Sequence, residues 1–230
     1  MPVALYVVFG GFFMDADIDK IVKILRDMTK KWKEPIVTEL TKKTHDPFKI
    51  LISTIISLRT KDDVTREASK RLYELADTPD ELLKLDPADI EKAIYPAGFY
   101  RNKVKTIQNI CRILIAKYQG KVPDDLDELL LIKGVGRKTA NLVLTMGYGK
   151  DGICVDTHVH RISNRLGYVS TRNPEETEFA LREKLPREYW KEYNDLLVTF
   201  GQNLCKPISP LCSQCPIHNF CKRVGVGNHR

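Results

Sequence analysis

Lys138 and Asp156 are two oppositely charged side chains that stand where helices are expected to begin. Lys138 follows the glycines of LIKGVGRKTANLVL, and the positive end of the helix dipole destabilises an ammonium ion in the first turn. If that lysine is also partly desolvated, its amine becomes a usable nucleophile near neutral pH. Backbone N–H groups at an N-cap would keep Asp156 charged as it approaches the lysine. The pair could therefore carry out nucleophilic catalysis; a surface lysine and a capping aspartate are the simpler alternative.

Four cysteines near the C-terminal end are close enough together to bind one metal centre. Their spacing is C-x6-C-x2-C-x5-C, in a proline-rich stretch with little apolar material to fold around: Cys205, Cys212, Cys215 and Cys221. Disulfides are less favoured, because no secretory signal is evident and the remaining Cys111 and Cys154 lie in apolar settings typical of free thiols. Zinc usually takes paired C-x2-C units, and only one occurs here. The spacing leans toward an iron–sulfur cluster and leaves zinc open.

The glycines before Lys138 predict a tight turn rather than a nucleotide-binding loop. A dinucleotide-binding fingerprint would need a third glycine at Thr139, and a P-loop would need one where Arg137 stands. Gly134 and Gly136 can instead form a hairpin between two helices, because glycine tolerates positive φ and close backbone approach. The turn by itself does not separate a binding hairpin from an ordinary helix-to-helix connection.

Helix patterns run through most of the chain and predict an all-α protein. With 230 residues and 43% hydrophobic side chains, the chain can bury one large core or two small ones. Apolar residues recur at three- and four-residue spacing, whereas alternating strand patterns are nearly absent beyond the N-terminal arm. We expect two helical lobes with a cleft between them. Four helices should begin at a capping residue followed by proline: Asp46-Pro47, Thr78-Pro79, Asp86-Pro87 and Asn173-Pro174.

Charge and composition favour a polyanionic partner. Lys and Arg number 37 against 30 Asp and Glu, giving a formal charge of +7 and a pI near 9.0, although a merely soluble basic protein would show the same balance. The apolar opening MPVALYVVFGGFF lacks the basic region and cleavage site of an export signal and is too short to span a bilayer. We expect residues 1–16 to form a disordered or strand-like N-terminal arm, and the protein to be cytoplasmic without a membrane segment.

Three motifs together resemble the endonuclease III family of bifunctional DNA glycosylases, within the helix-hairpin-helix glycosylase superfamily. They are LIKGVGRKTANLVL, CVDTHVHRISNRLG and the terminal cysteine spacing. The stretches ISLRTKDDVT and YPAGFYRNKVKTI also match, and LVTFGQNLCKPISPLC is similar to archaeal and eukaryotic members. The resemblance extends from about residue 17 to residue 222, nearly the whole chain.

The resemblance implies base excision repair of oxidised or damaged pyrimidines in duplex DNA. A damaged base is extruded into the cleft. Lys138 matches the lysine that attacks the sugar C1′, expels the base and forms a Schiff base, after which β-elimination cleaves the strand at the abasic (AP) site. Asp156 matches the aspartate that assists deprotonation of this lysine and stabilises positive charge on the sugar. The four cysteines match the ligands of a [4Fe-4S] cluster with a structural and DNA-docking role.

The resemblance also implies where DNA is held. The hairpin from Lys133 through Gly134, Val135 and Gly136 to Arg137 would grip one phosphate through backbone N–H groups. Three further residues would contact DNA. Arg59 stands where many bacterial members have a glutamine that fills the gap left by the extruded nucleotide, Phe99 stands where members place an apolar wedge, and Lys206 is a plausible phosphate contact.

The implied organisation is a six-helix barrel domain at 40–150, which contains the hairpin, and an iron–sulfur domain made of 17–39 with 151–230. A monomer is expected. Two other functions stay open at this point: a mismatch or adenine glycosylase of the same superfamily, whose members usually lack the Schiff-base lysine, and a non-catalytic iron–sulfur DNA-binding protein. Covalent trapping on DNA discriminates the lysine–aspartate enzyme from a non-catalytic DNA-binding protein.

Overall fold

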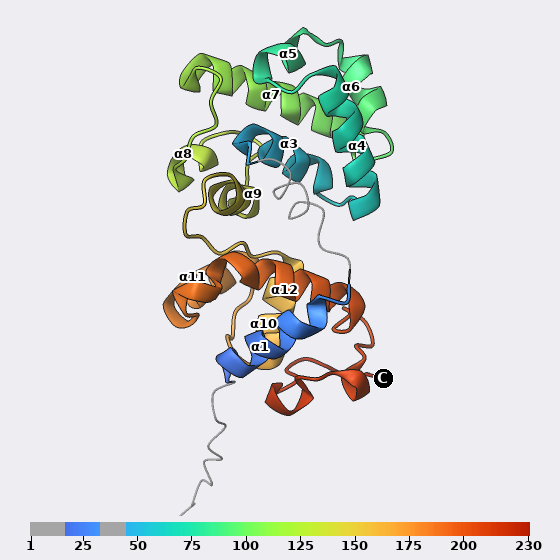
Figure 1. Ribbon diagram of the computed structural model, residues 1–230, viewed down its shortest axis with the longest axis vertical. Coiled ribbons are helices and arrows are strands. Elements are labelled where there is room, and N and C mark those ends of the chain that lie inside the picture. The colour runs from blue at the N-terminus through green and yellow to red at the C-terminus, as the bar shows by residue number, and fades with distance from the viewer. Residues whose placement is uncertain (1–16, 33–44) are drawn as a thin grey trace, which may run out of the picture.

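The computed structural model describes residues 17–32 and 45–230, and within these ranges all regular structure is helical. The helices form two lobes, stacked along the long axis of the molecule (Figure 1). The expected N-terminal arm at 1–16 lies outside the described residues. No helix in the described ranges is long and apolar enough to cross a bilayer.

The first lobe is built from consecutive helices around one apolar core. Isoleucines and leucines of α3 and α7 are fully buried at its centre, with Leu72 of α4, Leu82 of α5 and Ile90 of α6 packed around them. The helices of this lobe are α3 (Pro47–Ser57), α4 (Asp62–Leu75), α5 (Pro79–Lys84), α6 (Pro87–Ile94), α7 (Tyr100–Tyr118), α8 (Leu126–Leu130) and α9 (Arg137–Leu142), with a π-helical turn η1 (Val143–Gly147) continuing α9.

The second lobe combines α1 with the C-terminal helices. Helix α1 packs against α12, where Arg26 forms a two-point ion pair with Glu192, and Tyr193 and Phe200 fill the core. The helices of this lobe are α1 (Ile18–Thr29), α10 (Thr157–Leu166), α11 (Pro174–Lys184) and α12 (Trp190–Asn203), with short 3-10 turns η2 (Arg187–Tyr189), η3 (Cys212–Gln214) and η4 (His218–Phe220).

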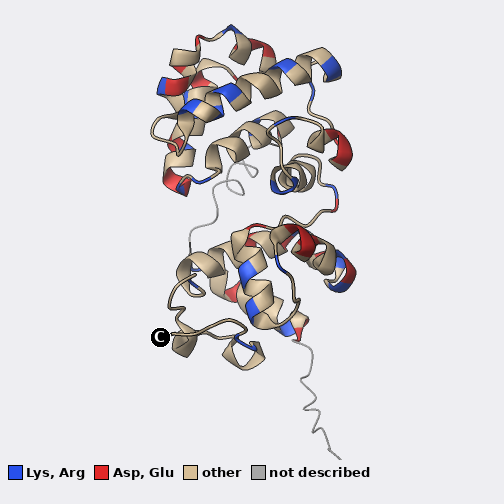
Figure 2. Ribbon diagram, turned by 180° about the vertical axis from the view of Figure 1, so that it is seen from behind, with Lys and Arg blue, Asp and Glu red and all other residues tan. Residues whose placement is uncertain are grey.

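Local sequence sets where several helices begin and end. The side chains of Asp46, Thr78, Asp86 and Asn173 each accept a backbone N–H at the start of α3, α5, α6 and α11, with proline next, as expected. Helix α10 ends at Leu166 and is capped by Gly167, whose φ of +70° is the left-handed conformation typical of the residue after a helix. Lys and Arg are distributed over both lobes rather than gathered on one helix (Figure 2).

Candidate active site and metal centre

The glycine turn forms a hairpin between α8 and α9, as predicted. Gly134 has a φ of +103°, and a Cβ added there would lie 2.6 Å from Thr106 Cγ2 of α7. Asn109 Nδ2, also on α7, donates to the Lys133 carbonyl at 3.2 Å. Gly134 and Gly136 are exposed, while Val135 is buried and anchors the turn. The hairpin is therefore held rigidly from beneath and presents backbone at its tip.

Lys138 and Asp156 meet across the gap between the lobes. Lys138 lies in the first turn of α9, and Asp156 is the N-cap of α10, as expected from the sequence. Asp156 Oδ1 accepts hydrogen bonds from the backbone N–H groups of His158 at 2.8 Å and Val159 at 2.9 Å. The other oxygen, Oδ2, lies 3.6 Å from Lys138 Nζ. The capping bonds fix the carboxylate, and its free oxygen faces the amine.

A cleft of about 830 Å³ surrounds this pair. Arg59 and Met146 from the first lobe line it, together with His158, Asn194 and Gln202 from the second. The side chain of Asp156 is only 10% exposed, whereas that of Lys138 is 36% exposed. Burial lowers the pKa of His158, which favours a neutral imidazole beside the pair. The amine is thus open to a molecule in the cleft, and the carboxylate is largely shielded from water.

Arg59 and Phe99 lie side by side on two exposed loops. The Arg59 guanidinium carbon is 5.5 Å from the centroid of the Phe99 ring, and Phe99 is 61% exposed. Arg59 borders the cleft, whereas Phe99 is outside its lining. The structure thus places the two predicted DNA-contacting side chains together at the rim of the cleft. Their contact could not be predicted from the sequence, where they lie far apart.

Arg137 differs from the rest of the predicted hairpin because its side chain is already engaged. Its guanidinium forms a two-point ion pair with Glu178 of α11, with Nε–Oε2 and Nη2–Oε1 distances of 3.0 and 2.9 Å. The Glu178 side chain is 3% exposed and also accepts from Arg182 Nε at 3.0 Å. This pairing bridges α9 and α11 across the cleft. Glu178 is not among the residues predicted from the sequence, because nothing in its helix pattern marks it as an inward-facing charge.

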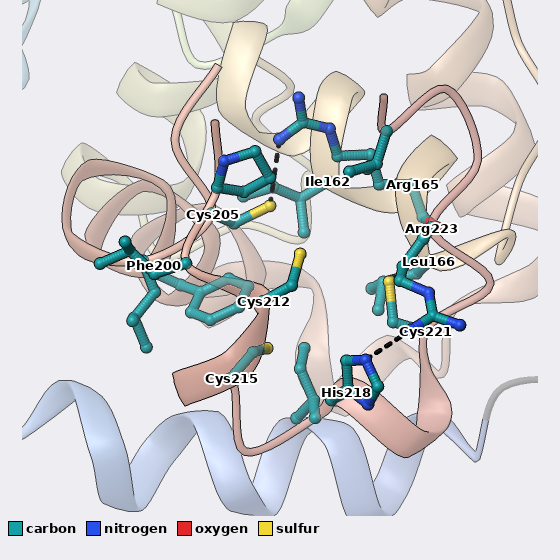
Figure 3. Close-up of a pocket in the computed structure, with 15 residues that line it drawn as sticks. Ile162, Arg165, Leu166, Phe200, Cys205, Cys212, Cys215, His218, Cys221 and Arg223 are labelled. Carbon is teal, nitrogen blue, oxygen red and sulfur yellow. Dashed lines mark hydrogen bonds between the residues drawn. The ribbon is translucent and has the colours of Figure 1, made fainter. Parts of the chain in front are cut away.

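The four terminal cysteines surround one pocket. Cys205 follows α12, Cys212 begins η3, and Cys215 and Cys221 follow η3 and η4. Figure 3 shows all four sulfurs directed toward the space enclosed by Ile162, Leu166 and Phe200 among other residues. The short 3-10 turns bring the cysteines together because they reverse the chain between successive sulfurs.

Arg165 of α10 holds the start of the cysteine loop and was not identified from the sequence. It is 9% exposed, and its guanidinium donates to the carbonyls of Lys206 and Pro207, each at 2.7 Å. Nη1 also lies 3.4 Å from Cys205 Sγ, a contact drawn in Figure 3. The predicted DNA contact Lys206 is half-buried in this loop. Arg165 therefore fixes the backbone of the loop at the point where Cys205 enters the pocket.

Comparison with known proteins decides the family. Residues 52–187 match the HhH-GPD superfamily of base excision DNA repair proteins, and residues 205–221 match the iron-sulfur binding domain of endonuclease III. Endonuclease III of Thermotoga maritima is 52% identical over 191 residues, which are 82% of this chain and 90% of that protein. The chain belongs to the endonuclease III family.

Other relatives of this endonuclease III family member extend the comparison. Endonuclease III-like protein 1 of Gallus gallus is 46% identical over 76% of this chain, which spans 63% of that longer protein. A solved structure of a trapped endonuclease III–DNA covalent intermediate matches with a TM-score of 0.77 at 36% identity, covering 89% of this chain and 95% of that one. The expected family, fold class and enzyme class, a bifunctional DNA glycosylase and AP lyase, are confirmed.

The cysteine pocket of this endonuclease III family member fits a [4Fe-4S] cluster, the confirmed cofactor. None of the six cysteines forms a disulfide. Burial raises the pKa of Cys215 to about 11, so binding to iron requires the loss of a tightly held proton. Among the described residues, no three His, Cys, Asp or Glu groups converge on a point that would hold a single ion. The sulfurs surround a shared space, and the match to an iron-sulfur binding domain sets zinc aside.

Cys111 and Cys154 lie away from this pocket, in the apolar settings that the sequence indicated. Both are buried, and burial raises the pKa of Cys111 to about 12 and that of Cys154 higher still. Cys154 Sγ donates to the Lys138 carbonyl at 3.7 Å, so it packs beneath the candidate nucleophile. Neutral, buried thiols of this kind are chemically inert.

Proposed function

We propose that Lys138 and Asp156 carry the reaction of this glycosylase and lyase. The observation that supports this assignment is the 3.6 Å separation of Lys138 Nζ and Asp156 Oδ2 inside a cleft that opens toward the amine. Asp156 is held by two backbone N–H groups, so its carboxylate stays oriented while the lysine can move toward a substrate. If Lys138 were only a surface lysine and Asp156 only a helix cap, nothing would require the two lobes to bring them together.

The reaction follows from the two side chains. Asp156 accepts a proton from the Lys138 ammonium, and the freed amine forms a bond to the sugar C1′. The bond between C1′ and the base breaks, and its electron pair leaves with the base. The departing base takes up the proton that Asp156 accepted, and the carboxylate so restored stabilises the positive charge on the sugar. Ring opening gives a Schiff base to Lys138, loss of a C2′ proton then breaks the C3′–O bond, and water finally releases the lysine.

The cleft is large enough to receive an extruded base. Its volume of about 830 Å³ falls in the range of roughly 300–1,000 Å³ that is typical of small-molecule pockets. The exposed Gln202 side chain is available to hydrogen-bond to a base edge, and Met146 supplies an apolar wall. We propose oxidised or damaged pyrimidines in duplex DNA as the substrates, which accords with the DNA complexes among the solved relatives.

The proposed DNA-binding surface follows the rim of the cleft. The hairpin from Lys133 to Arg137 would hold a phosphate by its backbone N–H groups, and Lys206 would contact another. Cys205, Cys212, Cys215 and Cys221 would hold the [4Fe-4S] cluster, which would give the cysteine loop a rigid support. Arg59 and Phe99 would face the DNA at the point of base extrusion.

We also propose that 40–150 is the barrel domain and that 17–39 with 151–230 is the iron–sulfur domain. The two separate apolar cores support this division, one spanning Phe48 to Leu144 and the other joining α1 to the residues from Ile153 onward. Because one chain supplies the whole cleft, the protein is expected to act as a monomer on the cell's DNA, in the cytoplasm or on the nucleoid of a prokaryote.

Borohydride trapping on duplexes with different lesions tests this function. The wild-type protein should form a covalent complex with DNA containing an oxidised pyrimidine or an abasic site. Lys138→Gln should abolish trapping and strand cleavage while leaving binding to an abasic-site analogue nearly intact. The control Lys133→Gln removes a lysine from the same hairpin and should still be trapped. Trapping that persists in Lys138→Gln would move the nucleophile elsewhere.

The same panel separates the alternative glycosylases. A mismatch or adenine glycosylase would act on undamaged bases in mispairs, and a non-catalytic DNA-binding protein would bind without releasing any base. Base release limited to mispaired normal bases would replace the proposed substrate class.

A further inference from the structure

Lys103 is a buried lysine that the proposed chemistry does not use. It projects from the first turn of α7, and it is 6% exposed. Its ammonium donates to the Ile56 carbonyl at 2.6 Å, the Leu58 carbonyl at 2.7 Å and Thr60 Oγ1 at 2.8 Å. A lysine ammonium has three N–H donors, and here three oxygens accept them. All three acceptors lie at the end of α3 or in the loop between α3 and α4.

The same loop also contacts the loop before α7. The Gly98 N–H donates to Thr60 Oγ1 at 3.1 Å, so Thr60 bonds to both Lys103 and Gly98. A Cβ added at Gly98 would lie only 2.3 Å from the Arg59 carbonyl oxygen, so a side chain at this position would force the two loops apart. Lys103 therefore sits behind a junction in which two loops touch backbone to backbone.

Each loop presents one exposed side chain from an unusual backbone conformation. Arg59 has a φ of +54° and Phe99 a φ of +56°. Left-handed conformations are costly for residues other than glycine, and they persist only where surrounding contacts hold them. Their side chains stack with a guanidinium-to-ring distance of 5.5 Å, and Arg59 lines the cleft that contains Lys138. The contacts that hold this stack in place are those of Lys103, Thr60 and Gly98.

We propose that Lys103 is a positioning residue that locks the Arg59 and Phe99 loops into one unit at the rim of the Lys138–Asp156 cleft. This inference rests on the proposed function, because it concerns how the same site engages DNA. A rigid loop matters because a side chain that enters a base stack from a flexible loop must first be ordered. That loss of conformational entropy weakens binding. Burial lowers the pKa of Lys103 to about 8, so near neutral pH most of the side chain is still the ammonium that can fill all three acceptors.

A purely structural role would make Lys103 interchangeable with other buried residues of α7. Leu114 lies three turns further along this helix and is fully buried. Its truncation in Leu114→Ala should lower stability without reaching the loops, and so provides the matched control. The variant Lys103→Met keeps the apolar stem in place and removes only the three donors.

The experiment measures unstacking directly. A duplex carries an abasic-site analogue in one strand and 2-aminopurine opposite to it, whose fluorescence rises when it leaves the stack. At saturating protein, the wild type and Leu114→Ala should give the full rise, whereas Lys103→Met should give a much smaller one. The preference of Lys103→Met for the analogue over undamaged duplex should fall by about tenfold, as expected when charge-assisted hydrogen bonds no longer hold a loop. Lys103→Arg should restore part of the signal.

Two further variants decide the matter if Lys103→Met does not fold. Gly98→Ala separates the same loops without touching the lysine, and it should reproduce the loss of fluorescence. Phe99→Ala should weaken analogue binding in the wild type, but it should add little in a Gly98→Ala or Lys103→Met background, because coupled residues are not additive. Full fluorescence in both Gly98→Ala and Lys103→Met would overturn the inference. Losses of analogue binding that add up when Phe99→Ala is combined with either variant would also overturn it.

Borohydride trapping is run on the same samples to separate this inference from the proposed function. Lys103→Met should still be trapped at saturating protein, since Lys138 and Asp156 are untouched. Absence of trapping in the wild type would count against the proposed chemistry alone. Unchanged fluorescence in Lys103→Met and Gly98→Ala would count against the positioning role of Lys103 alone.

Discussion

Asp156 directs its two carboxylate oxygens to different tasks: Oδ1 caps α10, and Oδ2 lies 3.6 Å from Lys138 Nζ. The capping bonds come from backbone N–H groups, so they are present whatever occupies the cleft. The carboxylate can therefore respond to a change at Lys138 without losing its own orientation. This division of tasks is the basis of the first prediction.

Asp156→Asn should slow base release by on the order of a hundredfold, because the amide oxygen can still cap α10 but no longer stabilises positive charge. Strand cleavage at a preformed abasic site should fall less, since an aldehyde reacts with an amine without expulsion of a base. Single-turnover rates on the two substrates measure the difference. Asp86→Asn, the same change at the N-cap of α6 in the first lobe, is the control. An equal loss on both substrates would mean that Asp156 only holds the structure together.

Gly134→Ala should weaken binding to an abasic-site duplex by about tenfold, because a non-glycine residue at positive φ costs roughly 1–2 kcal/mol and the hairpin must shift. The added Cβ would also lie 2.6 Å from Thr106 Cγ2. Gly136→Ala is the matched control, since no atom lies within 4 Å of the added Cβ there. Thr106→Ser removes the clashing methyl group and should recover part of the affinity. Equal affinities for the two glycine variants, measured by titration, would contradict this account.

Salt dependence should distinguish the basic residues at the rim. The logarithm of the binding constant should fall with the logarithm of salt concentration by about 0.9 for each phosphate contacted. Lys206→Met should reduce this slope by about one unit if it contacts a phosphate. Arg137→Met should leave the slope nearly unchanged, because its guanidinium is occupied by Glu178. A reduced slope for Arg137→Met would show that the ion pair opens on DNA.

Glu178→Gln should lower the free energy of unfolding by about 3 kcal/mol, because it leaves a half-buried Arg137 and Arg182 without their shared carboxylate. Glu175→Gln is a close comparison: Glu175 also faces Arg137, at 3.9 Å, but its side chain is 64% exposed. An exposed pair of this kind is worth less than about 1 kcal/mol, so little change is expected. Chemical denaturation of the cluster-loaded protein measures both. Similar values for the two variants would show that the bridge between α9 and α11 adds no stability.

Protein purified without air should contain about four iron and four sulfide per chain, as a cubane cluster requires. Cys212→Ser should lose the visible chromophore, because Cys212 lines the metal pocket. The control variants Cys111→Ser and Cys154→Ser replace buried thiols elsewhere and should keep it. Stoichiometric zinc without iron in anaerobic protein would refute the cluster.

Local chemistry determined much of this protein from its sequence. A capping side chain followed by proline starts a helix whatever lies beyond it, and the four helices expected at Pro47, Pro79, Pro87 and Pro174 begin there. Cysteine spacing indicated a metal site because a short loop must bring its own thiolates together. The helix-terminal positions of Lys138 and Asp156 were likewise readable, since each depends on a few neighbouring residues.

The tertiary structure alone decided which of these groups meet. Lys138 and Asp156 face each other only because α9 and α10 belong to different lobes that close on one cleft. The pairing of Arg137 with Glu178 joins residues 41 apart, and that of Lys103 with Thr60 joins residues 43 apart. No local periodicity marks such partners, because a buried charge is satisfied by whichever group the packing of distant helices brings within reach. The type of each side chain showed which interactions it could make, and the packing of the helices determined which partner it makes them with.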